Sequence, residues 1–240
     1  MRTAAIVLAL LLLAGCSSGA SPTVAVGSPA VTSPSASAAA SPTIAPAPPG
    51  MTLMRDGSLH AATTYATAAF GVRFAITVGK LAPDRHWFAS ETALVHQLEI
   101  GDPDLEGEGV QFYLPTAAYD ADGNEEPVPA DFVDWLATSP HLQVVSKRDI
   151  TVGGRPAVAV TVRVRAETVP TVSSLCHEKC VLVASTAPDA PFRPLELFAS
   201  SIPWTVVVVD TDAGQLLISE ESGSVQADAK KLVATLQFLP

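Results

Sequence analysis

One run in the middle of the chain carries the densest set of oxygen ligands. It is Asp120-Ala121-Asp122-Gly123-Asn124-Glu125-Glu126, and its alternating oxygen-bearing side chains make Asp120, Asp122 and Asn124 candidate calcium ligands. Gly123 comes too early for an EF-hand, and no glutamate stands at the twelfth position of the loop. A solvated acidic turn is therefore the favoured interpretation. The same two interpretations apply to a second acidic loop, which contains Asp102, Asp104, Glu106 and Glu108.

The histidines and serines show no recognisable catalytic spacing. Residues 51–240 contain no His-x-x-x-His or His-Glu-x-x-His arrangement, no Gly-x-Ser-x-Gly elbow, no Ser-x-x-Lys and no phosphate-binding glycine loop. Catalytic triads can be scattered along a chain, so these absences lower an enzyme hypothesis without excluding it. An envelope hydrolase would need a pocket that joins a carboxylate to His141 or His86. The sequence suggests no cofactor.

The N-terminus predicts export. Arg2 precedes an apolar run from Ala4 to Leu13, which is too short to span a bilayer and is typical of a secretory signal. Leu13-Ala14-Gly15-Cys16 then resembles the lipobox of bacterial lipoprotein signal peptides. This resemblance implies cleavage after residue 15, lipidation of Cys16 with palmitate as an expected acyl group, and anchoring at the extracytoplasmic face of the cell membrane. The alternative is an ordinary signal peptide with Cys16 incidental.

Residues 16–50 predict a disordered tether. They are almost entirely Ser, Ala, Pro, Thr, Val and Gly, and they contain no acidic or basic side chain. Such a segment cannot bury enough apolar surface to offset its chain entropy. Its Ser, Thr and Pro content is also similar to that of O-glycosylated stalks. Residues 51–240 then form a single exported domain, long enough to bury a sizeable core.

The two remaining cysteines, Cys176 and Cys180, are four residues apart. In an exported protein an even remainder favours a disulfide between them. A metal site that uses both thiolates and His177 is the alternative, although zinc sites more often use a Cys-x-x-Cys pair. The spacing also departs from the Cys-x-x-Cys of redox catalysts.

The charge balance restricts the partners. The formal net charge is −10, with 14 basic and 24 acidic residues. An acidic domain argues against nucleic acid, because binding to phosphates needs clustered Lys and Arg. It also argues against attraction to anionic lipid, so contact with the membrane is expected through the lipid anchor alone.

Hydrophobic periodicity predicts two hairpins. Val158, Val160, Val162 and Val164 alternate with other residues across 157–165, and the turn Val152-Gly153-Gly154-Arg155 joins this strand to one at 143–146. The second hairpin pairs 205–210 with 215–219. Its unbroken run from Val206 to Val209 indicates a strand covered on both faces, and hence central in its sheet.

Two helices are predicted. One spans 130–138, with Asp131 in its first turn, Phe132 and Leu136 buried, and Trp135 in the core rather than serving as a ligand platform. The other begins after an N-cap at Ser224, and its apolar stripe is formed by Val225, Ala229, Leu232, Val233 and Leu236.

The first third of the domain is harder to interpret. A strand is expected at 70–78, and a hairpin at 94–100 and 110–114 across the acidic loop 101–109, although a helix over 90–98 fits the same residues. Together these elements predict an α+β domain, with a mostly antiparallel sheet packed by two or more helices.

The order of elements from Pro129 onward resembles the latter half of the PsbP/Mog1-like fold. The most specific pieces are the turn Val152-Gly153-Gly154 and the end of the closing helix, Thr235-Leu236-Gln237-Phe238. The whole chain also resembles uncharacterised lipoproteins of GC-rich Gram-positive bacteria. Both resemblances imply an assembly or binding factor.

Three functions follow as hypotheses. The first is a non-catalytic domain, anchored to the membrane, that binds a small ligand or an envelope protein. The second is a hydrolase of the cell envelope. The third is a structural module stabilised by calcium.

Overall fold

The computed structural model describes residues 46–67, 70–80, 87–90, 97–101, 109–169, 179–186, 194–199, 202–220 and 226–240. The predicted signal peptide, residues 1–15, lies outside them, as does the predicted tether except for its last five residues. The described residues all belong to one compact unit.

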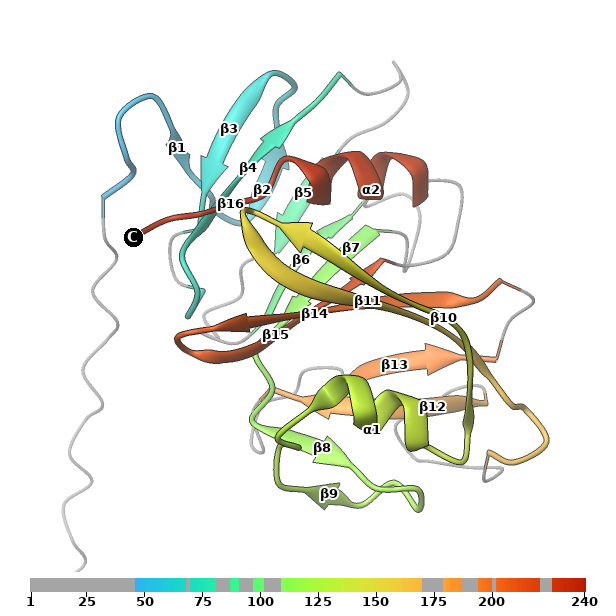
Figure 1. Cartoon of the computed structure of the whole chain (residues 1–240). Coiled ribbons are helices and arrows are strands. Elements are labelled where there is room, and N and C mark those ends of the chain that lie inside the picture. The colour runs from blue at the N-terminus through green and yellow to red at the C-terminus, as the bar shows by residue number, and fades with distance from the viewer. Residues whose placement is uncertain are drawn as a thin grey trace, which may run out of the picture. The chain divides into compact units, whose positions relative to one another are not determined.

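A long antiparallel sheet forms the middle of this unit, and eight of its strands lie in the described residues (Figure 1). Each strand pairs antiparallel with its neighbours. In spatial order they are β10 (Leu142–Val152), β11 (Arg155–Val164), β14 (Trp204–Thr211), β15 (Gly214–Glu220), β7 (Gly109–Tyr113), β6 (Gln97–Gly101), β5 (Trp87–Ser90) and β2 (Gly57–Leu59).

One face of this central sheet packs on a small second sheet and the longer helix. That sheet contains β1 (Thr52–Leu53), β3 (Thr63–Ala66), β4 (Phe74–Val78) and β16 (Gln237–Phe238), and the helix is α2 (Gln226–Ala234). The core between them joins Phe74 and Ile76 to Leu232 of α2 and to Val207 and Val209 of β14. Ala229, Leu232, Val233 and Leu236 are buried, as the apolar stripe predicts. Ser224 and Val225 lie outside the described residues.

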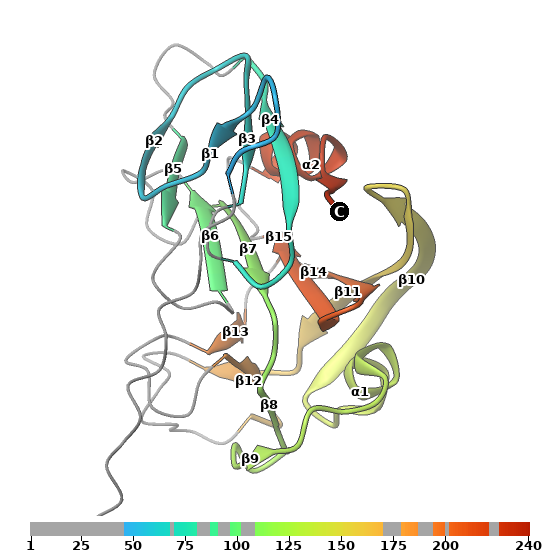
Figure 2. The same ribbon diagram turned by 90° about the vertical axis from the view of Figure 1, so that its left-hand side faces the viewer.

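The opposite face packs on a third sheet and the shorter helix (Figure 2). The sheet contains β13 (Leu195–Phe198), β12 (Cys180–Ser185), β8 (Ala117–Tyr119) and β9 (Glu125–Glu126), and the helix is α1 (Phe132–Thr138). Their side chains form a second core with Val206 and Val208 of β14 and Leu217 of β15.

The run Val206–Val209 is central, as predicted. Successive valines of β14 enter the two cores alternately, because neighbouring side chains of a strand point to opposite faces. On β11, Val160, Val162 and Val164 are buried in one core, while Ala157 and Ala159 enter the other.

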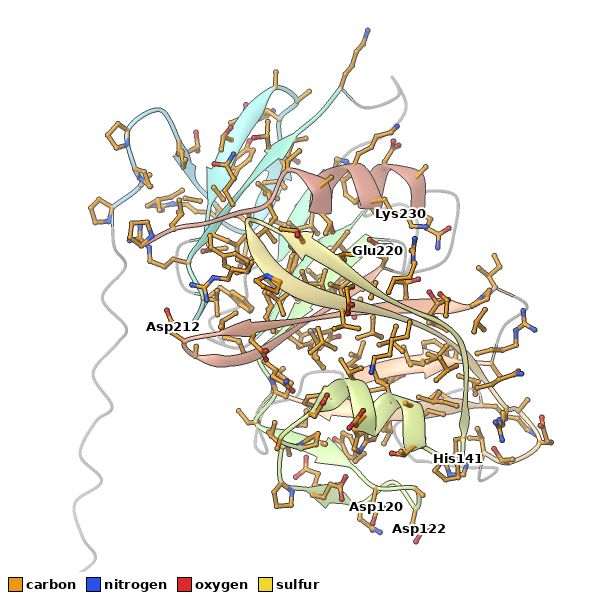
Figure 3. The ribbon with its side chains drawn as sticks, in the orientation of Figure 1. Asp120, Asp122, His141, Asp212, Glu220 and Lys230 are labelled. Atoms are coloured by element: carbon orange, nitrogen blue, oxygen red, sulfur yellow. The ribbon has the colours of Figure 1, made fainter. Side chains whose placement is uncertain are left out.

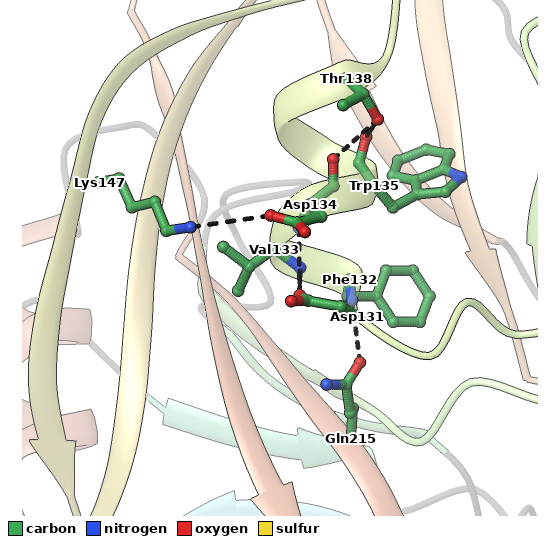
Figure 4. Close-up of polar contacts among 8 residues, drawn as sticks. All are labelled: Asp131, Phe132, Val133, Asp134, Trp135, Thr138, Lys147 and Gln215. Atoms are coloured by element: carbon green, nitrogen blue, oxygen red, sulfur yellow. Dashed lines mark hydrogen bonds and ion pairs between the residues drawn. The ribbon is translucent and has the colours of Figure 1, made fainter.

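The first residues of α1 are fixed by two side-chain acceptors (Figure 4). Asp131 is the N-cap rather than a first-turn residue, and its Oδ1 accepts from the N–H groups of Val133 at 2.8 Å and Asp134 at 3.1 Å. Gln215 of β15 accepts from the N–H of Phe132 at 3.0 Å. Because these are the donors that a helix start leaves unsatisfied, α1 begins at a defined residue and packs directly on the central sheet.

The domain contains less helix than the predicted α+β class implies. The sheet is mostly antiparallel, as expected, but α1 and α2 have only seven and nine residues and the domain is largely β. The hairpin prediction for 94–114 is confirmed by β6 and β7, and the helix over 90–98 is wrong where Ser90, Gln97 and Leu98 are described. The predicted strand at 70–78 begins only at Phe74.

Candidate functional site

β10 forms one edge of the central sheet, and most of its residues are exposed. β10 ends the strand order, and within the described residues no strand pairs with its outer side (Figure 2). Of its 11 residues, only Leu142 and Val152 are buried. A bulge between Val144 and Ser146 leaves Val145 outside the pairing, with Val144 and Val145 38% and 52% exposed.

The turn of this hairpin determines which backbone groups face outward. Gly153 and Gly154 have φ of 57° and 84°, the signature of a type I′ turn, so Val152 and Arg155 form the closing hydrogen-bonded pair. Hydrogen-bonded and non-hydrogen-bonded pairs alternate along an antiparallel ladder. The N–H groups of Lys147, Asp149 and Thr151 therefore point away from β11.

The β10–β11 hairpin is basic within an acidic chain. Residues 142–165 contain five of the 14 basic residues but only one of the 24 acidic ones, Asp149. Lys147 Nζ lies 3.9 Å from Asp134 Oδ1, and Arg155 Nη2 lies 3.6 Å from Asp212 Oδ2. Exposed pairs at such distances contribute little stability. Arg163 and Arg165 form no ion pair with the described residues.

A buried carboxyl lies on the same sheet at the α2 face. Glu220 pairs in register with Thr205, which pairs with Thr161, and the two threonine hydroxyls are 3.2 Å apart. Glu220 is 6% exposed, and its burial raises the pKa of the carboxyl above 4.5, while attraction to Lys230 and Arg148 opposes that rise. Figure 3 shows Glu220 beneath α2, the helix that carries Lys230. Within the described residues, no hydrogen bond joins this carboxyl to a nucleophile.

The candidate calcium ligands form a tight turn between β8 and β9. Asp120 Oδ1 accepts from the N–H groups of Asp122 at 2.9 Å and Asn124 at 2.8 Å, and Asn124 Nδ2 donates to Asp120 Oδ2 at 3.1 Å. The hydrogen bonds from Asn124 lower the pKa of Asp120. Among the described residues no group of three His, Cys, Asp or Glu side chains is placed to hold a metal ion. The geometry favours a solvated turn, and the loop 102–108 lies outside the described residues.

The imidazole of His141 contacts this turn. Its Nε2 lies 2.7 Å from the carbonyl oxygen of Ala121, and its Nδ1 lies 3.1 Å from the hydroxyl of Thr168 (Figure 3). Trp135 packs on the second core, as predicted, and its indole N–H donates to Glu126 at 3.0 Å. His86, the other histidine proposed for an active site, lies outside the described residues.

Of the three cysteines, Cys180 is the one that lies among the described residues. Cys180 is buried at the start of β12 and is disulfide-bonded. Cys176, its predicted partner, and the lipidation residue Cys16 both lie outside the described residues, so the Cys176–Cys180 pairing and the lipid remain predictions. No described helix is long and apolar enough to cross a membrane.

One cavity of about 180 Å³ lies where the turns of both hairpins meet β16. Arg155 stacks over the ring of Phe238 at 4.9 Å, and Arg73 donates to the carbonyl oxygens of Pro46 at 3.3 Å and Pro240 at 3.4 Å. Because both guanidinium groups already join separate segments of the domain, we assign them a structural role.

Comparison with protein-family models, with curated proteins and with solved structures finds no match for this chain. The function is therefore argued from the site itself.

The sequence arguments missed the two features that distinguish the site. The concentration of basic residues between 147 and 165 is visible in the sequence, and a local charge count would have found it. The burial of Glu220 has no such signal, because it follows from the packing of α2 and the neighbouring strands.

Proposed function

We propose that this protein is a membrane-anchored, extracytoplasmic binding module that takes up an extended segment of a protein partner along the outer edge of β10. The observation that carries the proposal is the exposed β10 edge itself. An added strand would receive hydrogen bonds from the outward N–H groups of Lys147, Asp149 and Thr151, which is the physical basis of β-strand addition. Val144 and Val145 would supply an apolar contact beside those bonds.

The β10 edge suits a protein partner better than the two cavities lined by described residues suit a small ligand. These cavities measure about 180 and 80 Å³, below the roughly 300–1,000 Å³ of sites that enclose a drug-sized ligand. An exposed strand edge needs no cavity, because backbone hydrogen bonds provide affinity and neighbouring side chains provide selectivity. The PsbP/Mog1-like resemblance belongs to this proposal, since that group mostly contains assembly and binding factors.

The anchor is the second part of the proposal. Lipidated Cys16 and the uncharged segment up to residue 50 would hold the domain away from the bilayer, where a strand edge is accessible to other envelope proteins. In a lipoprotein-exporting host, Cys16→Ala is expected to abolish labelling by radioactive palmitate and to move the protein to the soluble fraction. Labelling that persists in this variant would refute the anchor.

Strand addition is tested by amide hydrogen exchange on the full chain carrying Cys16→Ser. The probe is a capped peptide of alternating threonine and valine, which is uncharged. We expect the amides of Lys147, Asp149 and Thr151 to gain protection, while those of Arg148 and Ile150, directed at β11, change little. Thr151→Pro removes one outward N–H without changing charge and should weaken binding. Protection elsewhere, or none with peptides of any charge, would refute the proposal.

A further inference from the structure

The charge of the β10–β11 hairpin indicates what kind of strand would bind there. Its cations lie on both faces of the sheet. Lys147 lies on the face of α1, where it approaches Asp134, and Arg148 lies on the opposite face, where it influences the buried Glu220. Arg163 shares the face of Arg148, because its neighbours Val162 and Val164 point into the core on the α1 face, whereas Arg148 pairs with Ala159 of the other core. A strand added to β10 would therefore meet positive charge on either side.

We propose, building on strand addition at β10, that the partner segment is acidic, with carboxylates opposite Lys147 and Arg148 and an apolar residue beside Val144 and Val145. Opposite charges on neighbouring strands attract across the sheet, and like charges directly opposite repel. The positive hairpin would also steer an acidic segment toward this edge before contact.

The charges already present leave room for such a partner. Asp134 lies 3.9 Å from Lys147, and both side chains are exposed. A partner carboxylate that replaced Asp134 at Lys147 would therefore cost little stability. Glu220 attracts Arg148 but is itself buried beneath α2, where Lys230 also attracts it. Arg163 has no ion-pair partner among the described residues.

A second copy of the chain fits this edge less well. Two copies paired through β10 would bring two basic hairpins together, and their like charges repel. The tether is uncharged and offers no complementary charge either. An acidic segment of another protein is therefore the occupant that the charges favour.

The experiment compares three capped peptides in which pairs of valines alternate with pairs of glutamates, threonines or lysines, so that the variable side chains lie on both faces of an added strand. Fluorescence anisotropy on the full chain carrying Cys16→Ser gives their dissociation constants. We expect the glutamate peptide to bind about tenfold more tightly than the threonine peptide, and the lysine peptide to bind most weakly. This order is opposite to what the net charge of −10 alone would produce. The preference should shrink as salt rises from about 0.05 to 0.5 M.

Single substitutions show which cations cause the preference for the glutamate peptide. Arg148→Gln and Arg163→Gln should each reduce the glutamate advantage about threefold. Lys231→Gln, which removes an exposed cation of α2 that is paired with Asp228, should leave it unchanged. Circular dichroism confirms that each variant is folded.

The outcomes separate the two proposals. Equal affinity for all three peptides, with alternating amide protection along β10, would overturn the acidic partner and leave strand addition standing. Failure of all three peptides to protect β10 would overturn both. A stable dimer in sedimentation velocity that Thr151→Pro dissociates would show that the occupant is a second copy and would overturn the acidic partner.

Discussion

The hairpins β14–β15 and β10–β11 are both antiparallel, closed by short turns and part of one sheet, yet only one has an exposed edge. In β14 a single residue, Asp210, is exposed, whereas β10 is buried only at its two ends. β14 lies between β11 and β15 with a core on each face, and β10 has one strand neighbour among the described residues.

The β14–β15 hairpin contributes most to the stability of the sheet, whereas the β10 edge, which contributes little, is the surface proposed for binding. Each fully buried valine or leucine of β14–β15 contributes about 1.5–3 kcal/mol of transfer free energy. The outer residues of β10 gain little from burial, so they can vary without loss of the fold. Long bare edges normally carry charges or bulges that prevent aggregation, and β10 has both. The same basic side chains that prevent aggregation would select a partner segment of opposite charge.

The largest expected effect tests the central hairpin. Leu217 is fully buried in the second core, and Leu217→Ala should lower the free energy of unfolding by about 2–5 kcal/mol in urea denaturation. Val145→Ala, at the bulge of β10, should change it by no more than about 0.5 kcal/mol. Similar losses at the two positions would mean that β10 is as deeply packed as β15.

A second prediction concerns how the turn of the outer hairpin is held. A Cβ on Gly153 would lie 2.8 Å from side-chain carbons of Leu236 and Phe238, whereas one on Gly154 has open space. Either substitution by alanine should cost about 1–2 kcal/mol, because φ is positive at both positions. Gly153→Ala should cost about 1–3 kcal/mol more, measured by thermal unfolding of both variants. Equal costs would show that the turn is not packed against the C-terminal segment.

The third prediction tests the buried carboxyl of Glu220 at the end of β15. Because burial raises the folded-state pKa of Glu220 above 4.5, its contribution to stability is fully present below that pH and is lost as the pH rises through the folded pKa. Glu220→Gln should therefore gain stability relative to the native chain between pH 4 and pH 7 in urea denaturation. Asp149→Asn, at an exposed position of β10, is the control and should show no such trend. A constant difference across this range would contradict the raised pKa.

The smallest expected effect concerns the acidic β8–β9 turn. The carboxylate of Asp120 already accepts hydrogen bonds from Asp122 and Asn124, so calcium would have to displace them. Millimolar calcium or a chelator should change the melting temperature by less than about 1 °C, by differential scanning calorimetry. A clear calcium-dependent rise that Asp122→Ala abolishes would restore the calcium-stabilised module as a hypothesis.

Local sequence patterns were sufficient for much of the fold. The alternation at 157–165, the valine run 206–209 and the two glycines at 153–154 predicted both hairpins, because strand periodicity and positive φ are properties of a few adjacent residues. The apolar stripe of α2 was equally legible. The strands β12 and β13 were not predicted, and both follow the segment that contains Cys176.

The sequence by itself determined the strands of the two hairpins, where those hairpins turn and which of their faces are apolar. Only the tertiary structure decided that β10 has an exposed outer side, that Glu220 is buried and that His141 contacts a turn 20 residues away. The physical reason is that periodicity records whether a side chain meets water or core. It does not record which element buries that side chain, nor whether the backbone of an edge strand is paired with another strand.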